Sequence, residues 1–415
     1  MKLYGPFSQL LTFAHLPLAG PLRDEQLHII PDAAMVVDGE LNGGGTLVAV
    51  GTYAELKSQY RDAAHYIIDQ PTVALPGLID CHTHLCWDGS RANDFALRNG
   101  GASYLQLAEA GGGIKYTVAQ TRTADDPRLL ALISARIDRL AAQGITTIEC
   151  KSGYGLSVEE ELRHLALIDR AFQSKPTVDH VATCLAAHVC PPEFAGQPAA
   201  YLQHLAEHLL PQLAPRIRVD AFAEPSTFWG EPLQSYLQQA RARGHALTLH
   251  ADQFTAGGAA LACQLGAQSA DHLEHTDAAG IAALAKSAKT DRPTIAVALP
   301  GASLGLGEPH APARKLLDAG AALAIATDWN PGSAPQGHLL AQATILAAAE
   351  KLSNAEVFAA ITFRAAQALG LQDRGRLVAG QRADVSFWPT DNYQDITWSM
   401  GSMAPLLPAT IAQAA

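Results

Sequence analysis

Short apolar runs alternate with longer amphipathic stretches along most of the chain beyond Leu75. Eight of these runs have the length of buried strands, and most are followed by a loop and a stretch with helical spacing. Such alternation predicts parallel strands with helical crossovers, and eight units over about 300 residues are what a (β/α)8 barrel requires. The predicted strands are residues 77–81, 145–150, 181–187, 218–223, 246–250, 269–273, 294–299 and 323–327.

The stretches between these runs carry helix signals of their own. Residues 126–142 place Leu129, Ile133 and Ile137 on one face, and the pattern ends before Gly144. Ser157 followed three residues later by Glu160 is typical of a capping box at a helix start.

The two ends of the chain have a β-like pattern instead. Short strand-like runs at 34–37 and 46–50 are separated by Gly and Asp turns, and similar runs return at 380–388 and 409–412. We therefore predict a small β-sandwich domain made of residues 1–74 and 372–415, and a barrel domain of residues 75–371. The apolar N-terminal stretch is interrupted by His15 and Pro17, which favours a strand over a signal peptide.

Composition narrows the class of protein and its partners. A hydrophobic content of 48% with 17% charged residues, over 415 residues, is typical of a compact globular protein with a large core. A net charge of −11 argues against nucleic acid or an anionic membrane as a partner, and no apolar run has membrane-spanning length. The six cysteines lack framework spacing, which favours free thiols in the reducing cytoplasm.

Metal-ligand residue types follow several predicted strands at the end where barrel enzymes carry their active sites. His82 and His84 come directly after the first strand, and alternate side chains of an extended segment point the same way. His250 ends the fifth strand, His272 the sixth, and Asp328 follows the eighth. Three imidazoles and a carboxylate suit zinc or ferrous iron, with a position left for water.

Each of these residues also has a structural interpretation. The chain has 16 histidines, and a lone histidine at a strand end is more often a satisfied polar residue than a ligand. Asp328 could cap the next helix, but Pro331 and Gly332 place a turn between them. It is the coincidence of five ligand-type residues at matching strand ends that predicts a metal site.

Two further motifs suggest other chemistry. His204 to His208 match the H-x-x-E-H pattern of inverted zinc proteases, but their helical context predicts a solvated helix face. Residues 301–305 match the nucleophile-elbow pattern around Ser303. Pro309 and Pro312 crowd the place where a helix should begin, so we predict a loop at the barrel mouth there.

The order of the histidines and the aspartate resembles the amidohydrolase superfamily, and several further segments resemble the imidazolonepropionase family within it. The segments that carry this resemblance are CHTH at 81–84 with Arg91 seven residues beyond it, GASY at 101–104, GGGI at 111–114, KSGYG at 151–155, AH at 187–188, HADQ at 250–253, ADHLE at 270–274 and ATDWNPGS at 326–333. The KSGYG and triple-glycine segments are the more specific ones, since the histidine and aspartate pattern is shared widely.

The resemblance implies a hydrolase that opens the ring amide of 4-imidazolone-5-propanoate to give N-formimino-L-glutamate. One divalent ion, zinc or iron, would be held by His82, His84, His250 and Asp328. The implied substrate-binding residues are Arg91, Tyr154, His188, Gln253, Asn330, Gly332 and Ser333. Metal-activated water would attack, with Asp328 as general base and with His272 and Gln253 orienting the reactants.

These implied roles agree with the chemistry of the side chains. An arginine such as Arg91 can hold the carboxylate tail of the substrate through two parallel hydrogen bonds, although an arginine chosen at random usually makes a surface salt bridge. Tyr154 lies between glycines in a predicted loop, where an aromatic ring has no core to fill, which favours a ligand contact. The segment from Arg91 to Ile114 is our candidate for a loop that closes over the substrate.

The chain departs from the family pattern at Ser333, where threonine is more frequent, and at Gln253, where glutamate is common. Superfamily members with two metals often have a carbamylated lysine after the fourth strand, but Glu224 stands there and Lys151 follows the second strand. The resemblance therefore implies one ion, with Glu224 as a candidate bridge to a second. A homodimer is common in the family.

Two alternatives remain open at this point. Another cyclic amidase or a heterocycle deaminase of the same superfamily would keep the metal site without needing Arg91 and Tyr154 together. A barrel that had lost catalysis could serve as a binding protein, although every expected metal and base position is filled.

Overall fold

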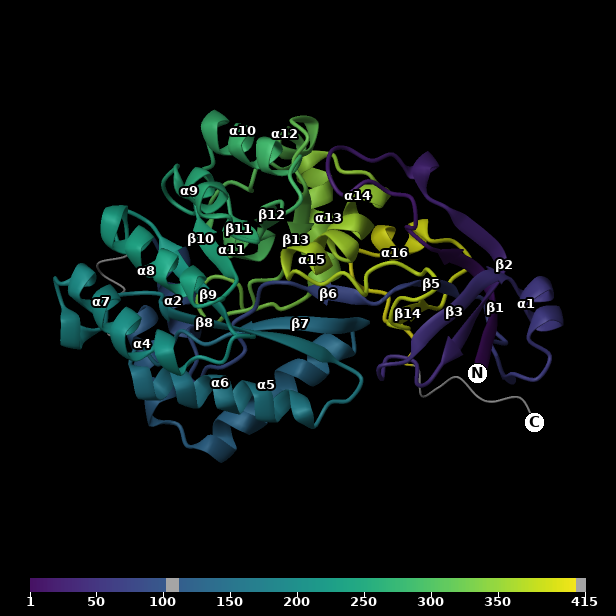
Figure 1. Cartoon of the computed structure of the whole chain (residues 1–415), viewed down its shortest axis with the longest axis horizontal. Coiled ribbons are helices and arrows are strands. Elements are labelled where there is room, and N and C mark those ends of the chain that lie inside the picture. Colours follow the sequence, from purple (N-terminus) through teal and green to yellow (C-terminus); the bar gives the residue numbers. More distant parts are fainter. Residues whose placement is uncertain (102–111, 408–415) are drawn as a thin grey trace.

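The computed structural model describes residues 1–101 and 112–407. It consists of a barrel and a smaller sheet that lie side by side, with the barrel on the left of Figure 1 and the sheet on the right. Most of the GASY segment and the first glycine of the triple-glycine segment fall at 102–111, outside the described residues, as does the predicted run 409–412.

The barrel strands form one parallel sheet in which every strand pairs with its neighbours in chain order. The strands are β6 (Leu78–Asp80), β7 (Ile145–Lys151), β8 (Asp179–Ala187), β9 (Arg218–Ala223), β10 (Leu247–Ala251), β11 (Ser269–His272), β12 (Ile295–Ala298) and β13 (Leu323–Ile325). Each overlaps one of the eight predicted strands. The predicted (β/α)8 barrel is confirmed.

Backbone hydrogen bonds between residues just beyond the ends of β6 and β13 join the first and last strands. The Asp328 amide donates to the His82 carbonyl, and the His84 amide donates to the Trp329 carbonyl, both at 3.0 Å. Thr83 and Trp329 form the parallel bridge between them. The candidate ligands His82, His84 and Asp328 thus belong to the backbone ladder that closes the barrel.

Helices lie around the outside of the barrel strands (Figure 1). Among the described residues the α-helices are α1 (Tyr53–Gln59), α2 (Ala92–Asn99), α4 (Ile114–Thr123), α5 (Asp126–Ala141), α6 (Val158–Gln173), α7 (Pro198–His208), α8 (Gly230–Ala242), α9 (Gly258–Leu265), α10 (Ala278–Ser287), α11 (Pro300–Leu306), α12 (Ala313–Asp318), α13 (Leu339–Glu350), α14 (Asn354–Ala360), α15 (Phe363–Ala368) and α16 (Gln394–Trp398). The predicted helix 126–142 is confirmed by α5. Ser157 caps α6 by accepting from the Glu160 amide at 3.3 Å, while the Glu160 carboxylate bonds to Arg163 at 2.9 Å.

The loop predicted at 301–305 is wrong, because these residues belong to α11. Pro300 occupies the first position of the helix, where its missing N–H costs nothing and its fixed φ favours helical geometry. Pro309 and Pro312 come after the helix has ended at Gly307, whose φ is 73°. The helix is short enough to finish before the prolines.

The smaller sheet is mixed and has the strand order β14-β5-β1-β2-β3, with β4 also paired to β1. Its strands are β1 (Lys2–Leu11), β2 (Ile29–Asp38), β3 (Thr46–Thr52), β4 (Ala64–Ile67), β5 (Val73–Pro76) and β14 (Val385–Trp388). Both ends of the chain therefore contribute, as predicted, since β14 runs antiparallel to β5. The division into domains 1–74 with 372–415 and 75–371 stays a prediction, and β5 lies across its first boundary.

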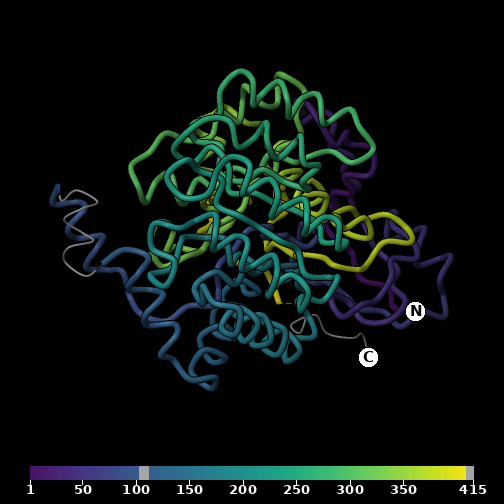
Figure 2. Tube along the Cα trace, turned by 60° about the vertical axis from the view of Figure 1, so that its left-hand side comes forward, coloured from purple at the N-terminus to yellow at the C-terminus, as the bar shows by residue number. Residues whose placement is uncertain are grey.

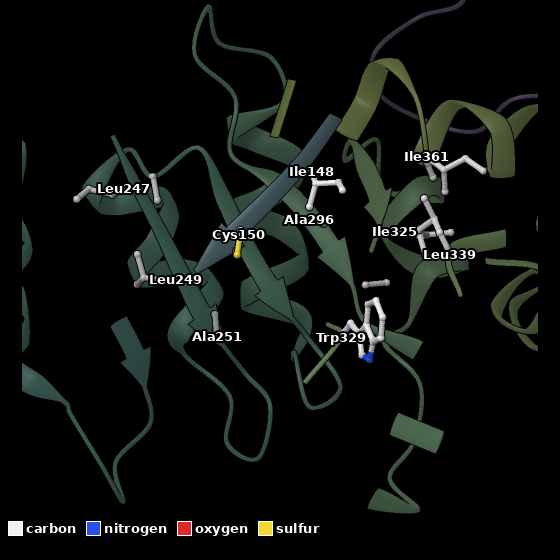
Figure 3. Close-up of a cluster of buried hydrophobic side chains, with 14 of the residues drawn as sticks. Ile148, Cys150, Leu247, Leu249, Ala251, Ala296, Ile325, Trp329, Leu339 and Ile361 are labelled. Atoms are coloured by element: carbon white, nitrogen blue, oxygen red, sulfur yellow. The ribbon is translucent and has the colours of Figure 1, made fainter. Parts of the chain in front are cut away.

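Successive side chains of a barrel strand point alternately to the apolar core and to the interior of the active site. Leu247, Leu249 and Ala251 of β10 belong to the large apolar cluster between strands and helices (Figure 3). Their neighbours Thr248 and His250 point to the other side of the strand. One five-residue strand thus supplies both packing and candidate chemistry.

Truncating Leu249 to alanine is expected to lower the free energy of unfolding by about 2–5 kcal/mol, because a fully buried leucine leaves a cavity in a close-packed core. Chemical denaturation measures the change. The matched control is Leu304→Ala, a 51% exposed leucine on α11, where a change within about 0.5 kcal/mol is expected. Equal losses for the two variants would contradict the assigned core.

Two features of the whole chain bear on its surroundings. All six cysteines are free thiols, four of them buried. Across residues 1–101 and 112–407, no helix combines the length and apolar character that crossing a membrane would need.

Candidate metal centre and substrate cavity

Three histidine side chains from two strand ends meet at the mouth of the barrel. His82 and His84 follow β6, His250 lies in β10, and one ligand-type atom from each falls within 4.8 Å of the others. Asp328, just beyond β13, places its Oδ1 atom 3.2 Å from His84 Nε2 and 3.5 Å from His82 Nε2. The structure thus brings together the four predicted ligands.

The arrangement fits a divalent cation on chemical grounds. His82 Nε2 and His84 Nε2 face each other at 3.3 Å in a buried site. Two imidazole nitrogens this close cannot both direct a proton at the other, and a cation between them removes the repulsion of their lone pairs. The Asp328 carboxylate beside them adds the negative charge that a dication needs.

Buried carboxylates orient two of the histidines from behind. His82 Nδ1 donates to Asp271 at 2.7 Å, and His250 Nδ1 lies 3.0 Å from Asp220. A partner on Nδ1 fixes the tautomer that leaves Nε2 free to ligate a metal.

Lys151 is a buried cation that pairs with carboxylates behind the ligand histidines. Its Nζ atom lies 2.7 Å from Glu149 Oε1 and 3.0 Å from Asp220 Oδ2, with all three side chains excluded from solvent. The second Glu149 oxygen accepts from the Thr83 amide at 3.0 Å, between the two ligand histidines. Sequence reasoning missed these partners, yet a signal existed, because charged residues inside buried strands require partners.

Asp328 is ionised in this environment. Burial disfavours the charged carboxylate, but hydrogen bonds from His82 and His84 outweigh it and hold the pKa of Asp328 well below its ordinary value. Its φ of 49° is a left-handed conformation, so the chain turns sharply directly after the strand. An ionised carboxylate at this place can ligate a cation or accept a proton.

His272 reaches the same centre through an irregular strand end. Adjacent residues of a regular strand point to opposite faces, yet Asp271 bonds to His82 while the His272 ring lies 5.1 Å from that of His250. The φ of 87° at His272 breaks the alternation and allows both contacts.

A buried glutamate just after β11 links His272 to α11. Glu274 Oε1 lies 3.4 Å from His272 Nδ1 and accepts from the Ser303 hydroxyl at 3.2 Å. Ser303, the residue of the nucleophile-elbow pattern, is thus buried and bonded to a carboxylate.

A cavity of about 720 Å³ opens beside the histidines. It is lined by eleven of the twelve predicted site residues, namely His84, Arg91, Tyr154, His188, His250, Gln253, His272, Asp328, Asn330, Gly332 and Ser333. The twelfth, His82, is fully buried behind them.

Tyr154 and His188 form one wall of the cavity. Their rings lie 5.5 Å apart, and each contacts His84. Burial and the nearby His84 charge lower the pKa of His188 to about 3, and its Nδ1 bonds to the Gly153 carbonyl, so the neutral ring is left with Nε2 as an acceptor. Burial raises the pKa of the Tyr154 phenol, which therefore keeps its proton.

The expectation that Tyr154 has no core to fill is wrong. Its ring is 4% exposed and packs with Val118 and Leu156 in a small apolar cluster. The KSGYG loop folds inward because the buried Glu161 carboxylate accepts from the amides of Gly155 and Leu156, at 2.9 Å and 2.7 Å.

Arg91 is tied to the described part of the glycine segment by Asp94. The buried Asp94 carboxylate accepts from the Arg91 guanidinium and from the Gly113 amide. A side chain at Gly112 would overlap this carboxylate, which explains the need for glycine there. Across the cavity the guanidinium also lies against Gly332.

The turn after β13 is built by Asn330. Its Oδ1 accepts from the amides of Gly332 and Ser333, both at 2.8 Å, and its Nδ2 donates to the Asp328 carbonyl at 2.7 Å. The predicted turn at Pro331 and Gly332 is present, and α13 begins well beyond it.

Gln253 lies in the loop after β10. Glu224 anchors this loop at the residues that follow Gln253. The Glu224 carboxylate accepts from the amides of Phe254, at 2.9 Å, and Thr255, and also from the Thr255 hydroxyl. In the described ranges, His82, His84 and His250 make up the only group of three ligand-type residues with metal-site spacing. Glu224 thus holds the loop of Gln253 in this structure.

His204 and His208 lie on α7, as predicted. Their rings are 4.7 Å apart, and His208 is exposed, 3.9 Å from Glu207. They form a partly solvated helix face, and neither lines the cavity beside the histidine centre.

Comparison with known proteins adds to this geometry. The Amidohydrolase family model matches residues 107–397. The chain is 41% identical over 380 residues to imidazolonepropionase from Cupriavidus necator, covering 90% of this chain and 88% of that protein. It is 41% identical over 415 residues to imidazolonepropionase from Deinococcus radiodurans, covering 97% and 96%. Among solved structures, atrazine chlorohydrolase from Arthrobacter aurescens complexed with zinc matches with a TM-score of 0.64 at 20% identity, covering 95% of this chain and 88% of that one.

Proposed function

The chain belongs to the amidohydrolase family and, within it, to the imidazolonepropionases, and from this premise we propose how its cavity performs that reaction. The enzyme hydrolyses the ring amide of 4-imidazolone-5-propanoate to N-formimino-L-glutamate, a step of histidine degradation. The observation that carries the proposal is one cavity that joins a metal-type histidine cluster to an arginine suited to a carboxylate.

A divalent ion, one per chain and either zinc or iron, would be held by His82, His84, His250 and Asp328. Two observations support this assignment. The Nε2 atoms of His82 and His84 face each other, and the Nδ1 atoms of His82 and His250 lie against Asp271 and Asp220. When bound, the ion lowers the pKa of a water molecule and polarises the ring carbonyl.

The remaining steps belong to the side chains of the protein. Asp328, held ionised, takes a proton from the attacking water as the carbon–oxygen bond forms. The same proton then passes from Asp328 to the departing ring nitrogen as the carbon–nitrogen bond breaks. Gln253 cannot carry a proton, so it and His272 orient the reactants.

The substrate is oriented by groups on opposite walls of the cavity. Arg91 binds the carboxylate tail, while Tyr154 and neutral His188 offer a donor and an acceptor to the ring. Asn330, with Gly332 and Ser333, shapes the turn that faces Arg91.

Replacing Arg91 by alanine is expected to raise KM about tenfold to a hundredfold, with a smaller change in kcat, because the tail loses a charge-assisted contact distant from the reacting bond. Initial rates, followed by the loss of substrate absorbance, measure both constants. Arg128→Ala removes a matched guanidinium–carboxylate pair, to Asp88, outside the cavity lining and should leave both constants unchanged. An unchanged KM in Arg91→Ala would contradict the carboxylate clamp.

A direct assay separates this function from the other amidohydrolase activities. Metal-loaded protein should consume 4-imidazolone-5-propanoate, with N-formimino-L-glutamate identified by mass spectrometry. Protein that leaves this compound unchanged but deaminates a purine or pyrimidine would overturn the assignment.

We also propose a cytoplasmic homodimer. The six free thiols support a reducing compartment. Trp398, 81% exposed at the end of α16, and the nearby exposed Met400 offer an apolar surface for a second copy. Light scattering of the purified protein measures the oligomeric state.

A further inference from the structure

A second guanidinium, that of Arg98, lines the same cavity as Arg91. Arg98 lies in the last turn of α2, and Arg91 is the residue that precedes the helix. Seven residues make about two helical turns, so the two side chains share one face and are separated by about 10 Å of helix rise. The segment that contains α2 projects from the body of the molecule on the left of Figure 2.

The two arginines differ in how their charge is balanced. Arg91 is hydrogen-bonded to the Asp94 carboxylate. Arg98 has no hydrogen-bonding or ion-pair partner within residues 1–101 and 112–407, and its guanidinium lies 5.9 Å from the Phe95 ring. Burial and the charge of Arg91 lower the pKa of Arg98, in keeping with two like charges facing one space.

The described carboxylates near Arg98 have other partners, since Asp94, which offsets part of the Arg98 charge, is hydrogen-bonded to Arg91. Glu308 lines the cavity, but its Oε2 atom lies 3.2 Å from His275 Nε2. The chain as a whole carries −11, so an anion approaching most of the surface meets repulsion. Within the described residues, this cation without a hydrogen-bonding or ion-pair partner lies at the cavity that also holds the histidine centre.

We infer that Arg98 is a specificity-determining residue that recruits small ring compounds bearing a carboxylate, before Arg91 fixes that carboxylate deeper in the cavity. The inference rests on the proposed function for the identity of the ring, but not for the recognition of the anion. Arg98 acts through its charge and at a distance, whereas Arg91 acts through a defined hydrogen-bond geometry.

The test uses the full-length, metal-loaded protein and two non-reacting probes that differ in one charge. Imidazole-4-propanoate carries the tail carboxylate, and its primary amide is neutral. Titration calorimetry at low and high salt gives both dissociation constants for the wild-type protein, Arg98→Gln and the control Arg216→Gln. Arg216 is a 65% exposed arginine paired with Asp169 outside the cavity, so its replacement removes the same net charge elsewhere.

Arg98→Gln is expected to weaken binding of the acid about fivefold at low salt, the size of effect that one charge has over about 10 Å through partly solvated space. The difference should shrink below about twofold at 0.5 M salt, where the screening length is only a few ångströms. Binding of the amide should not change, and Arg216→Gln should match the wild type throughout.

Equal weakening of acid and amide would show a merely structural role for Arg98 and overturn the inference. An unchanged affinity for the acid at low salt would overturn it as well. If the protein binds the acid in this charge-dependent way but fails to hydrolyse 4-imidazolone-5-propanoate, the proposed function fails while the recruitment of anions by Arg98 stands.

Discussion

Replacing Asp328 by asparagine is expected to lower kcat at least about a thousandfold while the protein stays folded. The amide keeps the shape of the side chain but can neither accept a proton from water nor carry one to the departing ring nitrogen. It also removes the negative charge that lies 3.2 Å from His84 Nε2. The rate is measured in single turnover with metal-loaded protein, and the fold by circular dichroism.

The matched control is Asp318→Asn, which changes an exposed aspartate that bonds to Arg314 on α12. It should retain wild-type kcat. Metal content separates the two proposed roles of Asp328, since a variant that keeps its metal but loses turnover has lost the base. Activity of Asp328→Asn within tenfold of the wild type would remove Asp328 as the base.

Replacing His250 by alanine is expected to remove nearly all bound metal and, with it, turnover. His250 supplies one of the three Nε2 or Nδ1 atoms in the cluster, and its loss leaves only His82, His84 and Asp328, which come from the two adjoining segments at the barrel closure. Metal per chain is measured by elemental analysis after dialysis, with a value near one expected for the wild type.

Thermal unfolding gives a second readout of the same site. A metal that binds the folded chain stabilises it by about 4 kcal/mol when present at a thousand times its dissociation constant. A chelator should therefore lower the Tm of the wild type but leave that of His250→Ala unchanged. His204→Ala alters the histidine pair on α7 and should keep both the metal and the response to chelator. Metal loss in His204→Ala, or full metal in His250→Ala, would contradict the assigned centre.

The barrel and the ligand positions were predictable because they depend on local patterns. Strand periodicity located β10 within one residue at each end, and a parallel sheet brings the carboxyl ends of its strands to one rim. Once the strands were placed, His82, His84, His250 and Asp328 had to converge there. Position along the chain was enough for this part of the site.

The support of the site was harder to predict because it depends on contacts between distant segments. Asp271 and His272 are adjacent, and a regular strand would turn one of them away, so the left-handed φ at His272 could not be anticipated from periodicity. Glu224 was a candidate metal bridge from its position, whereas its hydrogen bonds to Phe254 and Thr255 depend on how one loop folds against another. The helix at 300–306 begins with Pro300 at its favourable first position and ends before Pro309 and Pro312, so these later prolines do not prevent it.

The closure of the barrel has a consequence for how such an enzyme can change over time. The hydrogen bonds between the His82–His84 segment and the Asp328–Trp329 segment are made by main-chain atoms, which every non-proline residue provides. New side chains can therefore be introduced at these positions without opening the barrel. A scaffold of this kind allows mutation to explore other ligand sets and other reactions while its architecture is inherited intact.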